Sequence, residues 1–253
     1  MNVILCGYGR MGLMIEQIAL QSEDMEIIGV VHPGLYDSPL DVPGHADVII
    51  DFSYPGNLDG ILARARRDNS AVVIGTTGFT EEQLAQIREA SKTLRVMHSS
   101  NYSVGVAVLK RAVAMVAPAL KDSFDIEIVE THHNQKVDAP SGTAKMLLKA
   151  VDPDDGFDHV YGREGVPGVR GHEIGIHALR GGTVAGEHSV FFFGVDETLE
   201  FKHSATSRRI FAAGAMRAAR FVVNQPAGLY NMDDVLSYRR LQKSVMNTAD
   251  ERR

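Results

Sequence analysis

The segment Gly7–Gly12, with the sequence Gly-Tyr-Gly-Arg-Met-Gly, constrains the fold of this chain more than any other. It follows a short apolar segment, Val3–Cys6, typical of a strand, and precedes a segment of helical period, Leu13–Leu20. A second segment typical of a strand, Glu26–Val31, comes next. A G-x-G-x-x-G sequence between a strand and a helix, with a second strand within about 30 residues, is the context that a dinucleotide fingerprint requires. We therefore expect the chain to begin with a dinucleotide-binding unit.

Each glycine of this segment has a separate expected role. Gly7 makes the tight turn, Gly9 lets the backbone approach a pyrophosphate, and Gly12 lets the helix pack closely on the strand. An ordinary structural turn is the alternative, because the bare motif is weak evidence without its context.

The second strand lacks the acid that usually follows it. A carboxylate about 20 residues beyond the glycines binds the ribose 2′-hydroxyl of NAD in this fold. Here the position reads Val31-His32-Pro33. A histidine near the ribose tolerates a 2′-phosphate, and Arg10 in the glycine turn is a candidate to reach it. We therefore expect NADPH or NADH as the cofactor, with use of NADPH or of both as the hypothesis.

Strand and helix signals keep alternating up to about residue 103. Strands are predicted at Ala46–Phe52, Ala71–Ile74 and Leu94–Met97, with helices at Asn57–Arg67 and after the capping box that begins at Thr80. This alternation predicts a Rossmann-like, parallel, doubly wound sheet, an α/β fold whose ligands bind beyond the carboxyl ends of the strands. The loops at those ends contain Ser53, Gly75–Thr77 and Ser99–Tyr102.

The second half has a different pattern. An apolar helix from Val104 to about Ala117 leads to a loop-rich region at 152–168, and successive strands are predicted at Glu173–Leu179, Gly186–Phe193 and Glu197–His203. This order predicts a second α+β domain with a mixed or antiparallel sheet. We expect residues 1–103 with 206–253, including a helix at Arg208–Val223, to form the dinucleotide-binding domain. Residues 104–205 are expected to form the second domain, and the polar tail is expected to fray from Lys243.

Composition excludes several classes of protein. A net charge of −6 argues against nucleic-acid binding, and no apolar run approaches the about 20 residues that span a bilayer. The single cysteine, Cys6, is expected to be a buried structural thiol. His172 and His177 are five residues apart in a strand-like segment, so they fall on opposite faces and do not form the zinc motif of a helix. We expect a cytoplasmic enzyme without a metal.

The segment Glu130–Thr143 carries the chemistry of the second half. It joins an alternating apolar run, Asp125–Val129, to a helix-like run, Ala144–Ala150. Histidine titrates near neutral pH, and lysine does so when its pKa is lowered, so His132, His133 and Lys136 are candidate proton-transfer groups. Ser141 is a candidate N-cap, and the bare N–H groups of a helix N-terminus bind anions. A structural histidine and a solvated lysine are the alternatives.

This segment closely resembles the signature of the dihydrodipicolinate reductase family, also called 4-hydroxy-tetrahydrodipicolinate reductases. The resemblance covers nearly the whole chain, and further matching segments are Asp51–Ser53, Asn101–Gly105, Ile176–Thr183, Gly186–His188 and Phe211–Ala215. It implies His132 as proton donor or acceptor and Lys136 as proton-donating lysine. It implies substrate contacts at His133, Ser141, Gly142 and Thr143. It implies cofactor contacts at Gly7, Tyr8, Gly9, Arg10, Met11, Gly12, Gly75, Thr76, Thr77, Ser99, Ser100, Asn101 and Tyr102.

The resemblance also implies the reaction. This is the NAD(P)H-dependent reduction of 4-hydroxy-2,3,4,5-tetrahydrodipicolinate, a small dicarboxylate imine, with loss of water, in diaminopimelate and lysine biosynthesis. The resemblance implies a homotetramer formed through the second domain as well, and a dimer is the alternative. Substrate binding between two domains further predicts closure of these domains around the substrate. Two departures from the family pattern are a shorter glycine turn and the missing acid at His32-Pro33. Asn134 and Gln135 stand where some members have basic residues.

Two other functions remain as alternatives. One is a nicotinamide-binding sensor or a homologue without turnover, and the other is a related dehydrogenase that acts on an imine or semialdehyde. Oxidation of the reduced cofactor with substrate generated in situ distinguishes the enzyme from the sensor, and a panel of substrates distinguishes the two enzymes.

Overall fold

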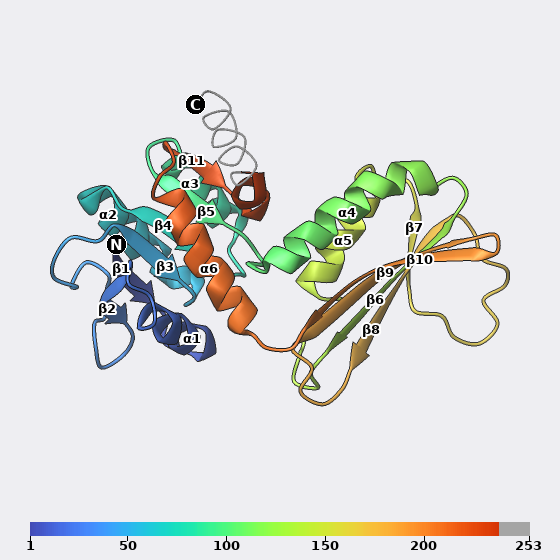
Figure 1. Ribbon diagram of the computed structural model, residues 1–253, viewed down its shortest axis with the longest axis horizontal. Coiled ribbons are helices and arrows are strands. Elements are labelled where there is room, and N and C mark those ends of the chain that lie inside the picture. The colour runs from blue at the N-terminus through green and yellow to red at the C-terminus, as the bar shows by residue number, and fades with distance from the viewer. Residues whose placement is uncertain (238–253) are drawn as a thin grey trace, which may run out of the picture. The chain divides into compact units, whose positions relative to one another are not determined.

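The computed structural model describes residues 1–237, so the predicted fraying from Lys243 lies outside the described part. The chain divides into two compact units (Figure 1). The first unit combines Met1–Val104 with the segment that begins at Arg209, and the second unit is Gly105–Arg208. The second unit is therefore an insertion in the first.

The first unit is built on a sheet of six parallel strands. Their order in space is β11-β5-β4-β3-β1-β2. The strands are β1 (Asn2–Cys6), β2 (Glu26–Val31), β3 (Val48–Asp51), β4 (Ala71–Ile74), β5 (Arg95–His98) and β11 (Gly228–Tyr230). Since all strands are parallel, their carboxyl ends meet at one edge of the sheet.

Helices cover both faces of this sheet. They are α1 (Arg10–Ala19), α2 (Leu58–Asp68), α3 (Glu81–Ala90) and α6 (Arg209–Val222), with a short 3₁₀ helix η1 (Pro55–Asn57) before α2. Apolar side chains of α2 and α3 share one core with the sheet, whereas α6 packs on β3, β4 and β5 and against α1. The predicted capping box is present at Thr80 and Gln83. The Rossmann-like, doubly wound fold is confirmed.

In the first unit, one prediction is confirmed and one strand was missed. Cys6 is fully buried, as expected, and burial together with the nearby Asp51 carboxylate raises the pKa of its thiol. The strand β11 was not predicted. It has only three residues, which is too short for a periodic pattern, and its partner β5 lies more than a hundred residues earlier in the chain.

The second unit holds a mixed sheet of five strands in the order β10-β9-β6-β8-β7. They are β6 (Asp125–His132), β7 (Asp158–Tyr161), β8 (Glu173–Arg180), β9 (Gly186–Gly194) and β10 (Glu197–Ala205). Strands β6, β7 and β8 are parallel, and β9 is antiparallel to β6 and β10, which confirms the predicted mixed sheet. The strand β7 lies in the region predicted to be a loop. Its four residues stand between segments that contain proline and glycine, which are typical of loops.

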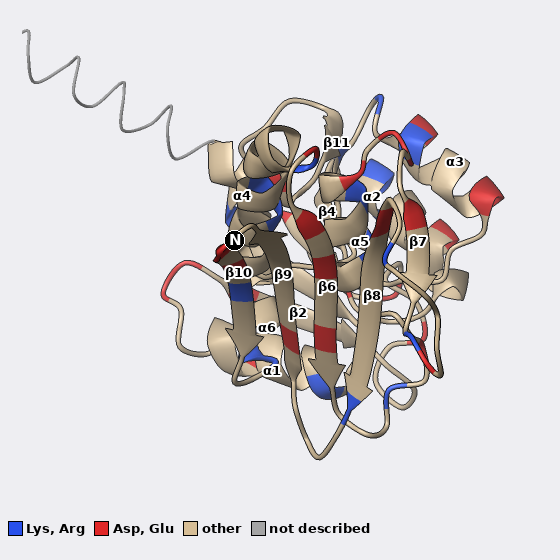
Figure 2. Cartoon of the chain, turned by 90° about the vertical axis from the view of Figure 1, so that its right-hand side faces the viewer, with Lys and Arg blue, Asp and Glu red and all other residues tan. Residues whose placement is uncertain are grey.

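Helices cover only one face of this second sheet. Helices α4 (Val104–Leu120) and α5 (Gly142–Val151) pack on that face, and Ile126 and Ile128 of β6 lie in the shared core. Figure 2 shows the other face, with β10, β9, β6 and β8 toward the viewer. On it Phe191 and Phe193 stack with ring centroids 5.5 Å apart. This sheet face carries apolar side chains that no helix of the second unit covers.

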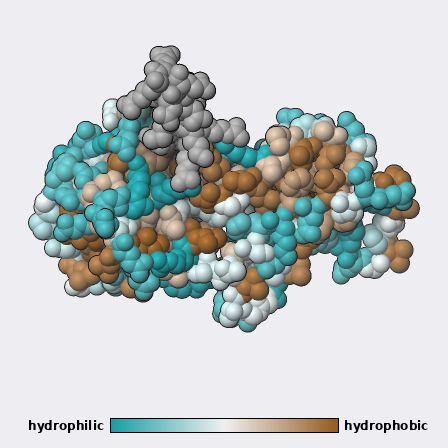
Figure 3. All heavy atoms as spheres, viewed as in Figure 1, coloured by the Kyte–Doolittle hydropathy of each residue, from teal (hydrophilic) through white to brown (hydrophobic). Residues whose placement is uncertain are grey.

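Exposed apolar side chains also lie on α4. Figure 3 shows apolar residues gathered over this helix. Val108 and Met115 of α4 are 52% and 77% exposed. Within residues 1–237, no helix combines the length and the apolar character needed to cross a membrane.

Candidate active site

The strand β6 places two functional side chains on its buried face. It extends to His132, three residues beyond the predicted end of the apolar run. Side chains alternate along a strand, so Glu130 and His132 follow Ile126 and Ile128 on the face that α4 and α5 cover. Glu130 is fully buried, whereas His133, beyond the strand end, is partly exposed. The two adjacent histidines therefore have different surroundings.

Glu130 binds three partners from three elements. Its two carboxylate oxygens each accept a hydrogen bond of 2.8 Å from the guanidinium of Arg180 on β8. Oε1 also accepts the backbone N–H of Ser141 at 2.9 Å, and Oε2 lies 2.6 Å from Nδ1 of His132. Burial alone would raise the pKa of Glu130, but its hydrogen bonds from Arg180, His132 and Ser141 outweigh burial and lower the pKa. The carboxylate is therefore held in its ionised form.

A third histidine packs against His132. The ring of His188 on β9 meets that of His132 edge to face, with centroids 5.1 Å apart, and its Nε2 lies 2.9 Å from Oγ of Ser141. Burial and the neighbouring His132 lower the pKa of His188 to about 4. His188 is therefore neutral near pH 7 and adds no charge beside Glu130.

The loop after β6 holds Lys136 beside an acid. Nζ of Lys136 lies 2.7 Å from Oδ1 of Asp138, and this ion pair lowers the pKa of Asp138. The backbone N–H of Lys136 donates to the carbonyl of His133, and the N–H of His133 donates to the carbonyl of Val184. Lys136 is 20% exposed. The loop thus fixes the backbone at Lys136 and leaves its ammonium group near the surface.

Helix α5 begins where the sequence predicted. Ser141 is its N-cap, and its Oγ accepts the N–H of Ala144 at 3.1 Å. Gly142 is exposed, Thr143 is partly exposed, and the first turn of the helix carries no acidic residue. The N-terminus of α5 therefore offers backbone N–H groups to an anion. His132, His133, Lys136 and this N-terminus all belong to one strand–loop–helix segment of the second unit.

Sequence reasoning missed three members of this cluster: Glu130, Arg180 and His188. Glu130 precedes His132 by two positions, and residues two apart on a strand lie on the same face, so the sequence contained a signal for Glu130. Arg180 and His188 were noted only as parts of matching segments. Their contacts with Glu130 and Ser141 depend on the pairing of β8 and β9 with β6.

The predicted cofactor residues of the glycine turn lie at the carboxyl end of β1. Gly7 has a φ of +91°, and a Cβ there would lie 2.4 Å from the carbonyl oxygen of Phe52. A Cβ on Gly12 would lie 2.2 Å from the carbonyl oxygen of Gly7, so each position requires glycine. Gly9 is the N-cap of α1 without a side-chain cap, and a Cβ there would meet open space. This bare helix N-terminus fits the pyrophosphate of a dinucleotide.

A pocket of about 430 Å³ lies beside this turn. It is lined by Gly7, Gly9, Val31, His32, Pro33, Tyr36, Asp37, Phe52, Ser53, Tyr54 and Asn57. Sequence reasoning missed Asp37. The chain turns back after β2, with the N–H of His32 donating to the carbonyl of Tyr36 at 3.0 Å. This turn brings the exposed carboxylate of Asp37 to the pocket, although no acidic residue stands at the end of β2.

The remaining residues of the glycine turn differ in exposure. Arg10 is the exposed first residue of α1, and Met11 after it is partly exposed. The hydroxyl of Tyr8 donates to Oε2 of Glu16 at 2.6 Å, and its ring meets that of His32 edge to face.

The other predicted cofactor loops follow β4 and β5 at the same edge of the sheet. Thr77 and Ser100 are exposed, Gly75, Ser99 and Asn101 are partly exposed, and Thr76 is buried. Oγ1 of Thr76 accepts the N–H of Ser53 at 2.9 Å, which joins the loops after β3 and β4. Tyr102 is buried, and its hydroxyl donates to the carbonyl of Ile74 at 2.7 Å. The buried side chain of Tyr102 therefore anchors the loop after β5 to the end of β4.

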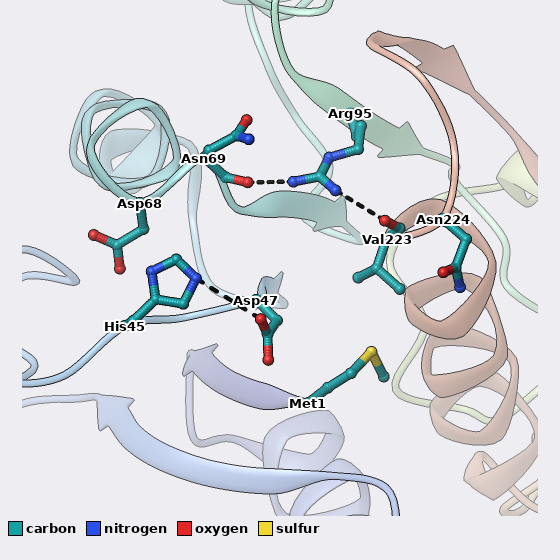
Figure 4. Close-up of a pocket in the computed structure, with 8 residues that line it drawn as sticks. All are labelled: Met1, His45, Asp47, Asp68, Asn69, Arg95, Val223 and Asn224. Atoms are coloured by element: carbon teal, nitrogen blue, oxygen red, sulfur yellow. Dashed lines mark hydrogen bonds and ion pairs between the residues drawn. The ribbon is translucent and has the colours of Figure 1, made fainter.

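A second pocket lies at the opposite edge of the first sheet (Figure 4). It is lined by Met1, His45, Asp47, Asp68, Asn69, Arg95, Val223 and Asn224. Its charged groups have partners: Arg95 donates to the carbonyls of Asn69 and Val223, and Asp68 binds the buried Arg64. Ligands of parallel sheets bind at the carboxyl ends of the strands. The pocket of Figure 4 is at the other end and is not the candidate cofactor site.

Two family models match the chain. The model described as dihydrodipicolinate reductase, N-terminus, matches residues 1–102, and the model described as dihydrodipicolinate reductase, C-terminus, matches residues 105–236. Curated relatives include the 4-hydroxy-tetrahydrodipicolinate reductase of Exiguobacterium sp., which is 43% identical over 93% of this chain and 95% of its own. That of Brachyspira hyodysenteriae is 43% identical over 94% of this chain and 100% of its own.

A solved structure shares the fold. The dihydrodipicolinate reductase from Paenisporosarcina sp., solved with dipicolinate bound, is similar with a TM-score of 0.73 and 24% identity. The similarity covers 91% of this chain and 97% of that one.

Proposed function

Because the chain belongs to the dihydrodipicolinate reductase family, we propose that the segment 130–143 binds and protonates its substrate. The enzyme reduces 4-hydroxy-2,3,4,5-tetrahydrodipicolinate to 2,3,4,5-tetrahydrodipicolinate with a nicotinamide cofactor and loss of water, in the diaminopimelate and lysine pathway. The single observation that carries the assignment of the site is that the contacts of Glu130 and Arg180 join His132, the loop of Lys136 and the N-terminus of α5.

The substrate carries two carboxylates, and the second unit offers groups that bind them. The N–H groups of Gly142 and Thr143 at the start of α5 bind one carboxylate by charge-assisted hydrogen bonds. His133, whose backbone is fixed by its bond to Val184, and Ser141 complete the substrate contacts. All four donors of the two terminal nitrogens of Arg180 are used by Glu130 and by the carbonyls of Asp138 and Leu179. Arg180 is therefore assigned to the framework.

The reaction needs a proton from the protein. Loss of water from the substrate gives a conjugated imine, and the nicotinamide cofactor supplies a hydride to C4. The resulting enamine takes one proton, so one hydride and one proton are added in total. Lys136, whose Nζ lies 2.7 Å from Oδ1 of Asp138, delivers this proton. His132, held through Nδ1, presents its Nε2 as the second proton-transfer atom.

The first unit holds the cofactor at the carboxyl edge of its sheet. Gly7, Gly9 and Gly12 shape the turn under the pyrophosphate, and the loops at 75–77 and 99–102 extend the same edge. The proposed contacts are Gly7, Tyr8, Gly9, Arg10, Met11, Gly12, Gly75, Thr76, Thr77, Ser99, Ser100, Asn101 and Tyr102. Tyr102 takes part through its backbone, because its side chain is buried.

The enzyme accepts both NADPH and NADH. His32 and Arg10 tolerate a 2′-phosphate. Asp37, which lines the same pocket as His32, accepts a hydrogen bond from a free ribose 2′-hydroxyl. We expect kcat/KM values for the two cofactors within about tenfold of each other, measured by loss of the reduced cofactor with substrate generated in situ. The substitution Asp37→Asn should lower kcat/KM for NADH and not for NADPH. A preference of about a hundredfold for NADH in the unchanged enzyme would contradict dual use.

The uncovered face of the second sheet forms the interface of a homotetramer. Phe191 and Phe193 stack on that face, and Leu179 on it is 49% exposed. Light scattering should give four times the chain mass of 27.6 kDa. The substitution Phe193→Glu should give smaller species, whereas Met115→Glu on the exposed side of α4 should not. A monomer in the unchanged protein would rule out this interface.

A further inference from the structure

We infer that Glu130 is a positioning residue: its buried carboxylate orients His132 and ties it to the substrate-binding N-terminus of α5. This role rests on the proposed function of His132 as a proton-transfer group. Glu130 is fully buried and needs no contact with the substrate to act. Its partners lie on β6, on β8 and at the start of α5.

The carboxylate determines which nitrogen of His132 carries a proton. An ionised carboxylate only accepts hydrogen bonds, so Nδ1 of His132, 2.6 Å from Oε2, must be the protonated nitrogen. In the neutral ring Nε2 then carries the lone pair. A Cβ on residue 186 would lie 2.9 Å from Nε2, so glycine at that position leaves room beside this atom. Glu130 therefore directs the reactive lone pair of His132 to the side where Gly186 has no side chain.

Arg180 keeps Glu130 charged and in place. Its bidentate contact occupies both carboxylate oxygens, and the same guanidinium donates to the carbonyl of Asp138 at 2.8 Å. Asp138 in turn binds Lys136. The ion pair of Glu130 and Arg180 thus links His132, the loop that carries Lys136, and Ser141 at the start of α5.

Glutamine cannot replace this carboxylate. Its amide has one acceptor oxygen and a nitrogen that only donates, whereas His132, Ser141 and Arg180 all donate toward residue 130. In the Glu130→Gln variant at least one donor faces another donor, and Arg180 loses its counter-charge. The ring of His132 is then free to adopt the other tautomer or to turn.

The test is a double-mutant cycle with Glu130→Gln and His132→Gln. We expect Glu130→Gln to lower kcat by at least about tenfold. The loss should not exceed the contribution of a proton-transfer group, about 10²–10⁴-fold, and KM should change less than kcat. In the His132→Gln background the same substitution should have little further effect, because its target is gone. Nitrogen NMR of the imidazole should show His132 protonated at Nδ1 in the unchanged enzyme and a mixture of tautomers in Glu130→Gln. The variant Glu130→Asp keeps the charge and should recover part of kcat.

The matched control is Asp152→Asn. Asp152 is also a buried carboxylate in contact with a histidine, His159 at 3.1 Å, but it caps the other end of α5. The Asp152→Asn variant should have a lower stability than the unchanged enzyme and the same kcat. Full kcat and an unchanged tautomer in Glu130→Gln would overturn the positioning role, as would equal losses of kcat in both backgrounds. Full kcat in His132→Gln alone would instead refute the proposed function of His132.

Discussion

Replacing Lys136 by alanine is expected to lower kcat by about 10²–10⁴-fold, the range for loss of a proton-transfer group. The enamine formed by hydride addition then has to take its proton from solvent. The dissociation constant of the cofactor should change little, because Lys136 belongs to the second unit and the glycine turn to the first. Steady-state kinetics and cofactor titration by fluorescence measure the two quantities separately.

The second unit offers a matched control for Lys136. Lys149 on α5 is also paired with an aspartate, Asp155 at 3.1 Å, and is 59% exposed. The substitution Lys149→Ala should leave kcat unchanged, since a surface ion pair contributes about 0–1 kcal/mol to stability and Lys149 is not in the site. If Lys136→Ala keeps full kcat, Lys136 is not the proton donor.

The substitution Gly9→Ala is expected to weaken cofactor binding by about 10- to 100-fold while the protein stays folded. A Cβ at residue 9 meets no other atom within 4 Å, so it creates no clash inside the protein. Its methyl group enters the space that the pyrophosphate needs, and overpacking of this kind costs about 1–3 kcal/mol. Titration with reduced cofactor gives the dissociation constant, and thermal unfolding gives the stability.

Gly12→Ala provides the contrast. Its Cβ would lie 2.2 Å from the backbone of Gly7, so it should lower the unfolding temperature as well as cofactor binding. Unchanged cofactor affinity in a folded Gly9→Ala variant would show that the pyrophosphate does not lie on this turn.

The sequence predicted the architecture where its signals were local. The glycine turn between β1 and α1, the capping box at Thr80 and the N-cap Ser141 each depend on a few neighbouring residues, and all three are present. Strand β11 was missed because it has only three residues, and β7 was missed because this edge strand, Asp-His-Val-Tyr, lacks the apolar run that marks β3, β4 and β5.

The site was predicted less completely, for a different reason. His132 and Lys136 belong to one continuous segment. Arg180 reaches Glu130 from 50 positions away, and it does so because the register of β6 with β8 pairs residue 132 with residue 180. A pairing of distant segments cannot be read from the residues of either one. Asp37 was missed similarly, because its approach to the pocket depends on the turn after β2.

The interruption of the first unit by the second has a consequence for synthesis on the ribosome. The second unit is one continuous segment, Gly105–Arg208, and can close its core as soon as it emerges. The first unit cannot, because α6, which buries Ala215, Met216 and Phe221, and the edge strand β11 are translated only after the second unit. Until then strands β3, β4 and β5 lack the helix that packs on one of their faces. The part of the chain that is made first is thus the last to finish folding, and a nascent chain halted before residue 209 would hold a complete second unit attached to an incomplete first one.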